Sequence, residues 1–364
     1  MIKHKVLILG AGKIGSLIAC LLSASNDYEL DLASRSFEKA RHLIDDLQLG
    51  NATAHGVDAG EAEPLAKLMG SKRFDAVISA LPYHRNAVVA ALAATLAINY
   101  FDLTEDIAVT RHIREIGERS KNVFMPQCGL APGFINIVAN DLMGRFTALD
   151  TVKLRVGALP QNSSNALKYA LLWSIEGVIN EYCEPCEAVV DGQLRTLMPL
   201  EGLESITLDG VSYEAFNTSG GLGTLAQTYS GRVQTLDYKT IRYPGHCQEC
   251  KLLLKDLKLN QDRDTLKRIL ENALPSTVRD VVIVYVSVSG MREGGILEDS
   301  YVRKIYPREI NGRAWSAIQV ATAAGLCSVL DIVLNDPENY RGFTAQESIS
   351  LSRFMDTPYG HNYD

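Results

Sequence analysis

The first third of the chain alternates between short apolar runs and longer segments whose apolar residues recur at helical spacing. Val6–Leu9 is an unbroken apolar run, as expected for a buried strand of a parallel sheet, and Tyr28–Ala33 alternates. Further strands are predicted over Thr53–Val57, Phe74–Ala80, Asn99–Thr104 and Asn122–Pro126. The segments between them predict helices over Ser16–Leu22, Phe37–Leu47, Glu61–Met69, Asn86–Leu96 and Glu105–Arg119, with Ser36 and Thr104 as N-caps. Such alternation predicts an α/β fold, a doubly wound parallel sheet that binds ligands at the carboxyl ends of its strands.

The pattern changes after Gly133, where turn signals and alternating runs replace the regular succession of strands and helices. Helices are predicted over Phe134–Met143, Asn165–Ile179 and Cys247–Lys255. Strands are predicted over Val152–Val156, Glu187–Asp191, Gln193–Met198, Glu204–Leu208, Ser212–Phe216, Val281–Ser289 and Ile296–Tyr306, with hairpin turns at Asp191-Gly192 and Asp209-Gly210. This region is therefore expected to form an α+β domain on a mixed or antiparallel sheet.

The end of the chain returns to a helical pattern. A long helix is predicted over Trp315–Leu334, and a capping box at Thr344–Glu347 precedes apolar Ile349 and Leu351. We expect this helix and the tail to pack on the first domain.

Composition limits the class of protein. A chain of 364 residues is too long for one ordinary core, which favours two domains. The net charge of −7 provides no basic surface for nucleic acid. Met1 leads directly into the first strand, so we expect no signal peptide, and residues 87–98 and 317–334 are too short or too polar for membrane spans. Seven dispersed cysteines favour reduced thiols and a cytoplasmic location.

A glycine pattern, Gly10-x-Gly12-x-x-Gly15, lies between the first predicted strand and the first predicted helix. Gly10 permits a tight turn, Gly12 lets backbone approach a pyrophosphate, and Gly15 lets the helix pack close to the strand. The helix N-terminus favours negative charge. The residues expected to contact a dinucleotide here are Gly10, Ala11, Gly12, Lys13, Ile14 and Gly15. We therefore expect a Rossmann domain over residues 1–132, completed by 315–364, with an inserted α+β substrate domain over 133–314.

The end of the second strand distinguishes NAD from NADP. An acid at this tip normally binds the ribose hydroxyl of NAD, but Asp31 lies inside the predicted strand. The tip itself is Ser34-Arg35, a hydroxyl and a guanidinium suited to a 2′-phosphate. NADP is therefore the preferred cofactor and NAD the alternative, in which Arg35 is only a solvated charge. Asp58, after the third strand, is expected near the adenine.

Two loops at the carboxyl edge of the predicted sheet carry titratable side chains. One loop follows the fourth strand, and its Ala80, Leu81 and Pro82 are expected to contact the cofactor. The other, Gln127–Gly133, follows the sixth strand. The titratable groups expected near the reacting centre are Tyr83, His84, Asp102, Glu105 and Cys128.

Two cysteine pairs, Cys183-x-x-Cys186 and Cys247-x-x-Cys250, have a spacing found in structural zinc sites. Their separation along the chain is long, and no glycine marks either pair as a knuckle turn. We therefore expect no metal.

Several motifs together resemble the saccharopine dehydrogenase family, including its lysine 6-dehydrogenase branch. They are Val6–Gly15, Ala80–Tyr83, Cys128–Gly133, Glu214–Phe216 with Ser219–Gly221, Tyr238–His246, and the segment from Gly342 to Tyr363. The resemblance implies a nicotinamide-dependent oxidation or reduction at a carbon–nitrogen bond on the ε-side of lysine or of a lysine adduct. It also implies a small amino-acid substrate, a substrate domain inserted into the cofactor domain, and a homodimer.

The same resemblance places Tyr83 and Cys128 near the substrate and the nicotinamide. It also leads us to expect Asp102, Ser219 and Gly220 at the substrate.

Hydride chemistry at an amine needs a proton acceptor and a hold on the substrate carboxylates. His246 has a suitable unperturbed pKa, and Arg242 or Arg232 can bind a carboxylate. We expect Tyr83, Cys128 and His246 to converge on one cleft that faces the glycine loop. In the alternative interpretation, His246 is a loop histidine bonded to backbone.

One position departs from the family pattern. Saccharopine-forming members typically read Gly-Leu-Asp-Pro-Gly, whereas this chain has Ala131 in place of the aspartate. Ala-Pro-Gly and the modest length resemble lysine 6-dehydrogenases, while Ser34-Arg35 resembles NADP-using reductases. The substrate is thus open between free lysine and a glutamate adduct. A polyamine enzyme like carboxynorspermidine synthase and a catalytically idle NADP-binding sensor are further alternatives.

Overall fold

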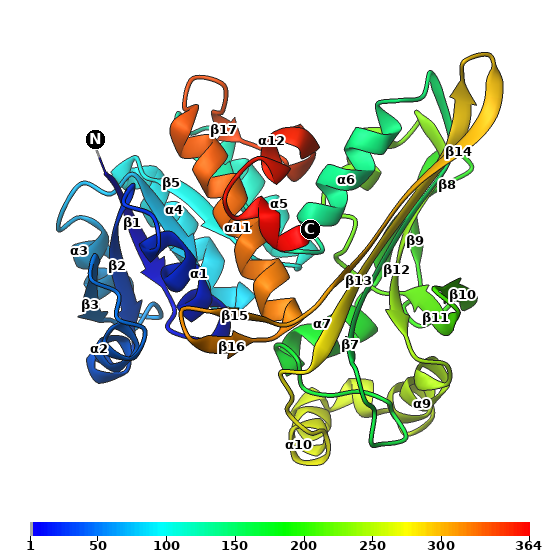
Figure 1. The fold of residues 1–364 in the computed structure, drawn as a ribbon, viewed down its shortest axis with the longest axis horizontal. Coiled ribbons are helices and arrows are strands. Elements are labelled where there is room, and N and C mark those ends of the chain that lie inside the picture. The colour runs from blue at the N-terminus through cyan, green and yellow to red at the C-terminus, as the bar shows by residue number, and fades with distance from the viewer. Residues whose placement is uncertain (1–2) are drawn as a thin grey trace. The chain divides into compact units, whose positions relative to one another are not determined.

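The computed structural model describes residues 3–364, which form two compact units (Figure 1). The first unit runs from the first described residue to Phe134 and includes Ile310–Arg313 and Gln319–Tyr363. The second contains Ile135–Glu309, Ala314–Ile318 and Asp364.

The first unit is built on a seven-stranded sheet in which every pair of neighbours is parallel. Its order is β17 (Gly342–Phe343), β6 (Val123–Met125), β5 (Asn99–Asp102), β4 (Ala76–Ser79), β1 (His4–Leu9), β2 (Tyr28–Ser34) and β3 (Ala52–Gly56). The order reverses direction at β1 and β4, so a ligand crevice is expected at their carboxyl ends. The predicted doubly wound α/β fold is confirmed.

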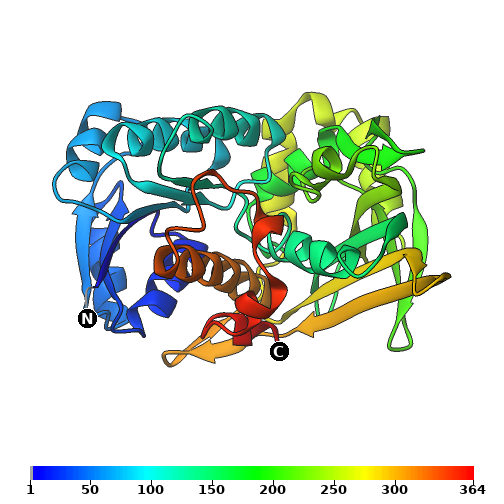
Figure 2. The ribbon, with the colours of Figure 1, turned by 90° about the horizontal axis from the view of Figure 1, so that it is seen from above.

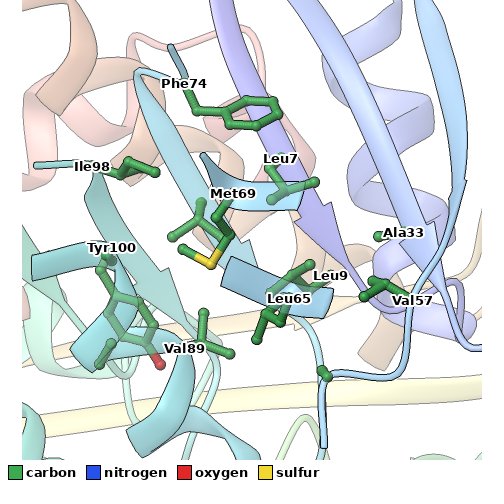
Figure 3. Close-up of a cluster of buried hydrophobic side chains, with 14 of the residues drawn as sticks. Leu7, Leu9, Ala33, Val57, Leu65, Met69, Phe74, Val89, Ile98 and Tyr100 are labelled. Carbon is green, nitrogen blue, oxygen red and sulfur yellow. The ribbon is translucent and has the colours of Figure 1, made fainter. Parts of the chain in front are cut away.

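Helices cover both faces of this sheet (Figure 2). They are α1 (Lys13–Ser23), α2 (Phe37–Asp46), α3 (Ala62–Met69), α4 (Asn86–Leu96), α5 (Ile107–Gly117) and α11 (Ala317–Asn335). On one face, side chains of α3, α4 and α5 pack on alternate strand residues, as Leu65 and Val89 do against Leu7 and Tyr100 (Figure 3). α11 is long and apolar enough to cross a membrane, but 89% of its most apolar window is buried, as in a core helix.

The second unit is built on a mixed sheet of eight strands. The main path is β10 (Glu204–Leu208), β11 (Val211–Asn217), β12 (Val233–Arg242), β7 (Ala148–Pro160), β13 (Asp280–Arg292) and β14 (Gly295–Ile305), and β8 (Cys186–Val190) pairs with β12 and with β9 (Gln193–Leu197). Only β12 and β7 run parallel; the other pairs are antiparallel. The helices of this unit are α6 (Phe134–Met143), α7 (Ile175–Cys183), α8 (Leu225–Tyr229), α9 (His246–Lys251) and α10 (Arg263–Ala273).

The two predicted hairpin turns are confirmed. Asp191 and Gly192 join β8 to β9, and Asp209 and Gly210 join β10 to β11, with two-residue loops. All four residues have positive φ, which is the geometry of the type I′ turn that Asp-Gly favours.

Three predicted helix starts are wrong, and in the first two a side-chain hydrogen bond explains the difference. The helix expected from Asn165 begins only at Ile175, because the Asn165 amide bonds the backbone of Tyr169 and holds that stretch in a turn. The expected cap Thr104 instead accepts from the N–H of Asp106, and Asp106 caps α5. The capping box at 344–347 forms one 3₁₀ turn, and the final helix α12 (Leu351–Met355) begins later.

The sequence patterns missed several short elements and two longer ones, β12 and α10. β12 carries polar residues at alternate positions of a central strand, and α10 has only a narrow apolar stripe in a mostly charged segment. Both depend on tertiary packing that periodicity alone does not show.

Asp280 at the start of β13 provides a test of helix capping. Its buried carboxylate accepts hydrogen bonds from the N–H groups of Ala317 and Ile318 at 2.6 and 3.0 Å, the first turn of α11. Asp280→Ala leaves these donors unpaired and should lower the free energy of unfolding by about 1–3 kcal/mol. Asp280→Asn, which keeps one acceptor, should cost less in the same denaturant titration.

Exposed Asp256 is the matched control, and Asp256→Ala should stay within about 0.5 kcal/mol of the unmodified chain. Equal effects of the Asp280 and Asp256 variants would contradict the capping role.

Candidate active site

The loop between β1 and α1 has a geometry that glycine permits. Gly10 has a φ of +113°, and a Cβ there would lie 2.6 Å from the carbonyl oxygen of Ala80. A Cβ at Gly15 would lie 1.9 Å from the carbonyl oxygen of Gly10. At Gly12, by contrast, no heavy atom lies within 4 Å of the added Cβ. The loop is therefore closed toward the sheet and open on its outer side.

The first turn of α1 fits the phosphates of a dinucleotide. Gly12 is the N-cap residue, no side chain caps the helix, and the first turn has no acidic residue. Lys13 is exposed and Ile14 half-buried beside this open space. Uncapped N–H groups together with the helix dipole attract an anion, so the predicted cradle of Gly10, Ala11, Gly12, Lys13, Ile14 and Gly15 has the right shape and polarity.

The tip of β2 offers a hydroxyl and a guanidinium but no free carboxylate. Asp31 is buried and paired with Lys72 at 2.5 Å and His55 at 2.6 Å, so it is not available to a ribose. Ser34 is the last residue of β2. The exposed Arg35 makes no ion pair or hydrogen bond within residues 3–364.

Asp58, expected near the adenine, lies after β3 and is half-buried. Its carboxylate accepts a hydrogen bond from the N–H of Gly60 at 2.8 Å and so shapes the turn before α3. Contact with an adenine stays a prediction.

Asp102 at the end of β5 is a fully buried carboxylate with four hydrogen-bond donors. It accepts from the side chains of Asn86 and Tyr100 at 3.1 and 2.6 Å, and from the N–H groups of Thr104 and Gln127, both at 3.0 Å. Burial raises its pKa to about 6, although these hydrogen bonds act in the opposite direction. Asp102 thus positions the loops after β5 and β6, and direct substrate contact stays a prediction.

Cys128 lies in the loop after β6, and three hydrogen bonds hold it there. Its N–H donates to the carbonyl of Asp102 at 2.9 Å, its thiol donates to the carbonyl of Met125 at 3.0 Å, and the Gln346 amide donates to its sulfur at 3.1 Å. Burial raises the pKa of this thiol well above its ordinary value. The structure therefore holds Cys128 as an uncharged thiol, not as a nucleophilic thiolate.

The loop after β4 carries the other predicted residues of this unit. Ala80 and Leu81 are half-buried and Pro82 is exposed. Tyr83 is half-buried at the start of a 3₁₀ turn over Tyr83–Arg85 and packs edge-on against the ring of His84. Because β4 lies beside β5 and β1 in the sheet, this loop borders both the glycine loop and the Asp102 loop.

Glu105 lies between two fixed residues in the loop after β5. The Thr104 hydroxyl accepts from the N–H of Asp106 at 3.2 Å, and the Asp106 carboxylate caps α5 through Val109. The Glu105 carboxyl group itself makes no hydrogen bond or ion pair with another residue of the described chain. Burial, together with the nearby charges of Asp106 and Asp102, raises its pKa to about 7.

His246, expected to be a base with a near-neutral pKa, is buried in the second unit. Its Nδ1 donates to the carbonyl of Leu167 at 2.6 Å, so its Nε2 is the acceptor for the hydroxyl of Tyr182 at 2.9 Å. Burial and the charge of Arg242 lower its pKa to about 3. The expectation that it titrates near neutrality is wrong, because the imidazole is neutral and its ring nitrogens are already engaged. The alternative interpretation, in which His246 is a histidine bonded to backbone, agrees better with the structure.

The two predicted arginines differ in exposure. Arg242 ends β12, is 2% exposed, and donates from Nε to the hydroxyl of Tyr182 at 2.8 Å. Its guanidinium also lies 5.0 Å above the ring of Tyr169. Arg232 is exposed and lies over the ring of Tyr229. Carboxylate binding by either residue stays a prediction.

The Ser219–Gly221 turn packs directly on the ring of Tyr238. The N–H of Ser219 donates to the carbonyl of Glu181 at 3.0 Å, and Gly220 has a φ of +87°. A Cβ at Gly221 would lie 2.4 Å from the ring of Tyr238. The motif therefore has a packing role, and substrate contact by Ser219 and Gly220 stays a prediction, as does the convergence of Tyr83, Cys128 and His246.

The seven cysteines are all free thiols. Cys247 donates to the carbonyl of Leu200, and Cys250 lies 3.3 Å from Nε2 of His246. Within residues 3–364 no group of three or more His, Cys, Asp or Glu side chains is placed to hold a metal ion.

Three residues that shape these environments were not singled out from sequence. Asn86 begins α4 and bridges Ser79 and Asp102, which its position after the Leu-Pro loop could have suggested. Gln346 reaches Cys128 across 218 positions, and Tyr182 reaches His246 across 64. No local pattern signals such long-range contacts.

Comparison with protein-family models accounts for both units. The NADP-binding domain of saccharopine dehydrogenase matches residues 6–124, and the C-terminal domain of saccharopine dehydrogenase matches residues 129–356. The chain belongs to the saccharopine dehydrogenase family. The predicted resemblance is thus confirmed over nearly the whole chain.

Curated relatives are distant and longer. The mitochondrial alpha-aminoadipic semialdehyde synthase of Bos taurus is 22% identical over 315 residues, which are 83% of this chain and 33% of that protein. The NADP⁺-dependent, L-glutamate-forming saccharopine dehydrogenase of Saccharomyces cerevisiae is 25% identical over 203 residues, 53% of this chain and 43% of that protein. The chain thus spans about a third of the length of the mammalian relatives.

A solved structure shares the fold. The L-Glu-forming saccharopine dehydrogenase from Saccharomyces cerevisiae superposes with a TM-score of 0.76 at 18% identity, covering 96% of this chain and 95% of the yeast chain.

Proposed function

We propose that this protein is an NADP-dependent oxidoreductase that acts on a carbon–nitrogen bond at the ε-side of lysine or of a lysine adduct. The family match over both units carries the proposal, because the glycine loop alone would fit many dinucleotide enzymes. The yeast relative is named for NADP⁺ and for forming L-glutamate, which supports an amine substrate for this chain as well. A homodimer and a cytoplasmic location are part of the same proposal.

A panel of amines tests this function directly. The full chain is mixed with NADP⁺ or NAD⁺ and with lysine, saccharopine or carboxynorspermidine, and cofactor reduction is followed by absorbance. We expect turnover with lysine or saccharopine. Turnover with carboxynorspermidine alone would assign a polyamine enzyme, and tight cofactor binding without turnover of any amine would assign a sensor.

Selectivity for NADP is expected to come from Arg35. A charge-assisted hydrogen bond to a 2′-phosphate contributes roughly 1.5–3 kcal/mol. Since Arg35 has no partner in the described chain and Asp31 is already paired, no acid is left to favour the ribose hydroxyl of NAD.

Replacing the Arg35 side chain should therefore weaken the binding of NADPH but not that of NADH. Arg35→Ala should weaken NADPH binding roughly 10- to 100-fold and leave NADH binding nearly unchanged, measured by fluorescence titration. Arg41→Ala is the matched control, because Arg41 is an exposed arginine of α2 paired with Asp45. Equal NADPH and NADH affinities in the unmodified protein would refute this origin of selectivity.

Glu105 is the side chain best suited to exchange the substrate proton. A bound nicotinamide supplies the hydride acceptor or donor. An amine gives up hydride only after it loses its proton, so a nearby base with a pKa close to neutral is needed. Glu105 follows the strand between those that carry Tyr83 and Cys128, and its carboxyl group is committed to no other residue of the described chain.

The pH dependence of the rate tests this role. Only the ionised carboxylate accepts a proton, so amine oxidation should increase as the pH rises through about 7. Glu105→Gln should lower the rate roughly 10²–10⁴-fold and abolish that rise, with cofactor affinity little changed. Exposed Glu115 of α5 is the control, and Glu115→Gln should retain the profile. An unaltered profile in Glu105→Gln would exclude Glu105 as the base.

A further inference from the structure

Arg85 ends the 3₁₀ turn after β4, and its guanidinium group lies against the loop after β3. A Cβ added at Gly60 would lie 2.4 Å from Nη1, 2.9 Å from Cζ and 3.1 Å from Nη2 of Arg85. Because all three atoms lie this close, a flat face of the group, not a single N–H, is turned toward Gly60. The side chain therefore joins two loops at the carboxyl edge of the same sheet.

The loop that carries Gly60 is held by its own hydrogen bonds. The N–H of Gly60 donates to the Asp58 carboxylate at 2.8 Å, and the N–H of Glu61 donates to the Asp58 carbonyl at 3.0 Å. Gly60 does not have a positive φ, so its backbone conformation does not require glycine. What requires glycine is the space that the guanidinium group of Arg85 occupies.

The guanidinium group of Arg85 has no polar partner in the described chain. The side chain is half-buried, yet within residues 3–364 none of its five N–H donors makes a hydrogen bond and no carboxylate lies within ion-pair distance. A charged group that is partly removed from water is normally paired. Gly60 covers one face of the group, and the part that stays exposed is available to a ligand.

The position of this group matches the adenine end of a dinucleotide. In a doubly wound sheet the pyrophosphate lies at the N-terminus of α1 and the adenosine ribose at the tip of β2, so the adenine extends toward β3. Ser34 ends β2, and Gly60 lies in the loop that follows β3. Although Arg85 belongs to the loop after β4, its guanidinium group reaches this adenine side.

An adenine fits this arrangement better than a phosphate. A planar guanidinium stacks on an aromatic ring, which it attracts through cation–π and dispersion forces. A guanidinium that binds a phosphate instead presents its N–H edge as a fork. The group of Arg85 already packs one flat face on backbone, which turns the opposite face toward a base.

We propose that Arg85 stacks on the adenine of the bound cofactor, while the backbone of Gly60 covers the other face of its guanidinium group. The proposal rests on the nicotinamide cofactor of the proposed function. It gives two arginines different roles. Arg85 contributes affinity for NADP and NAD alike, because both carry adenine, whereas Arg35 contributes selectivity between them.

Cofactor titrations separate the two roles. Arg85→Ala should raise the dissociation constants of NADPH and NADH by the same factor, about 5- to 30-fold, measured by fluorescence titration of the full chain. Arg85→Lys should not restore binding, because an ammonium group keeps the charge but not the plane. Arg119→Ala is the matched control and should leave both constants unchanged, since exposed Arg119 follows the C-terminal end of α5, at the opposite edge of the sheet.

Gly60→Ala tests the contact without removing the arginine. The new Cβ displaces the guanidinium group, so both dissociation constants should rise several-fold. In the Arg85→Ala background the same change should add nothing, because the contact is already lost. Gly50→Ala is the control, since no heavy atom lies within 4 Å of a Cβ at this exposed glycine.

The outcomes distinguish this stacking from other roles. Loss of NADPH affinity alone in Arg85→Ala, or rescue by Arg85→Lys, would assign a phosphate contact and overturn the stacking on adenine. Unchanged affinities in Arg85→Ala would overturn it as well, while leaving the proposed function intact. Failure of the unmodified chain to bind either cofactor would refute the proposed function and this inference together.

Discussion

The Asp102 carboxylate fixes the loops at the carboxyl edge of the sheet in the first unit. Its four donors come from α4, β5 and the loops after β5 and β6, and the Ser79 hydroxyl at the end of β4 reaches it through Asn86. Removing one partner of a buried charged group typically costs more than the hydrogen bond itself contributes, because the group left behind stays desolvated. The network therefore sets the relative positions of the Tyr83, Glu105 and Cys128 loops.

Sequence patterns predicted the first unit well because its signals are local. The first strand contains a continuous apolar run, and Gly10 and Gly15 stand where a Cβ would meet the backbone of neighbouring residues. The second unit was predicted less well. β12 lies in the middle of a mixed sheet, yet its sequence carries polar residues at alternate positions. The helix expected from Asn165 does not begin there, because the Asn165 side chain hydrogen-bonds the backbone of Tyr169. Burial of His246 also depends on α7 and on Leu167, far away in sequence.

Three carboxyl groups of the first unit differ in their hydrogen-bond and ion-pair partners, and these partners decide which of them is available to a ligand or a proton. Asp31 is buried and paired with Lys72 and His55, so it is not available to a ribose. Asp102 is satisfied by four donors and serves to position loops. Glu105 has neither a cation nor a donor from another described residue, and its pKa is raised to about 7. An acid that the fold leaves unpaired can exchange a proton near neutrality at little cost to folding.

The buried polar groups of the second unit, unlike Glu105, do not change charge near neutrality. Arg242, Tyr182 and His246 form a chain in which the guanidinium donates to the phenol and the phenol donates to the imidazole. Burial raises the pKa of Tyr182 and lowers that of His246, so neither changes charge near neutrality. Such a chain defines a unique core and holds Arg242 at constant charge. The first unit thus holds a carboxyl group that titrates near pH 7, whereas this hydrogen-bonded chain of the second unit keeps its charge there.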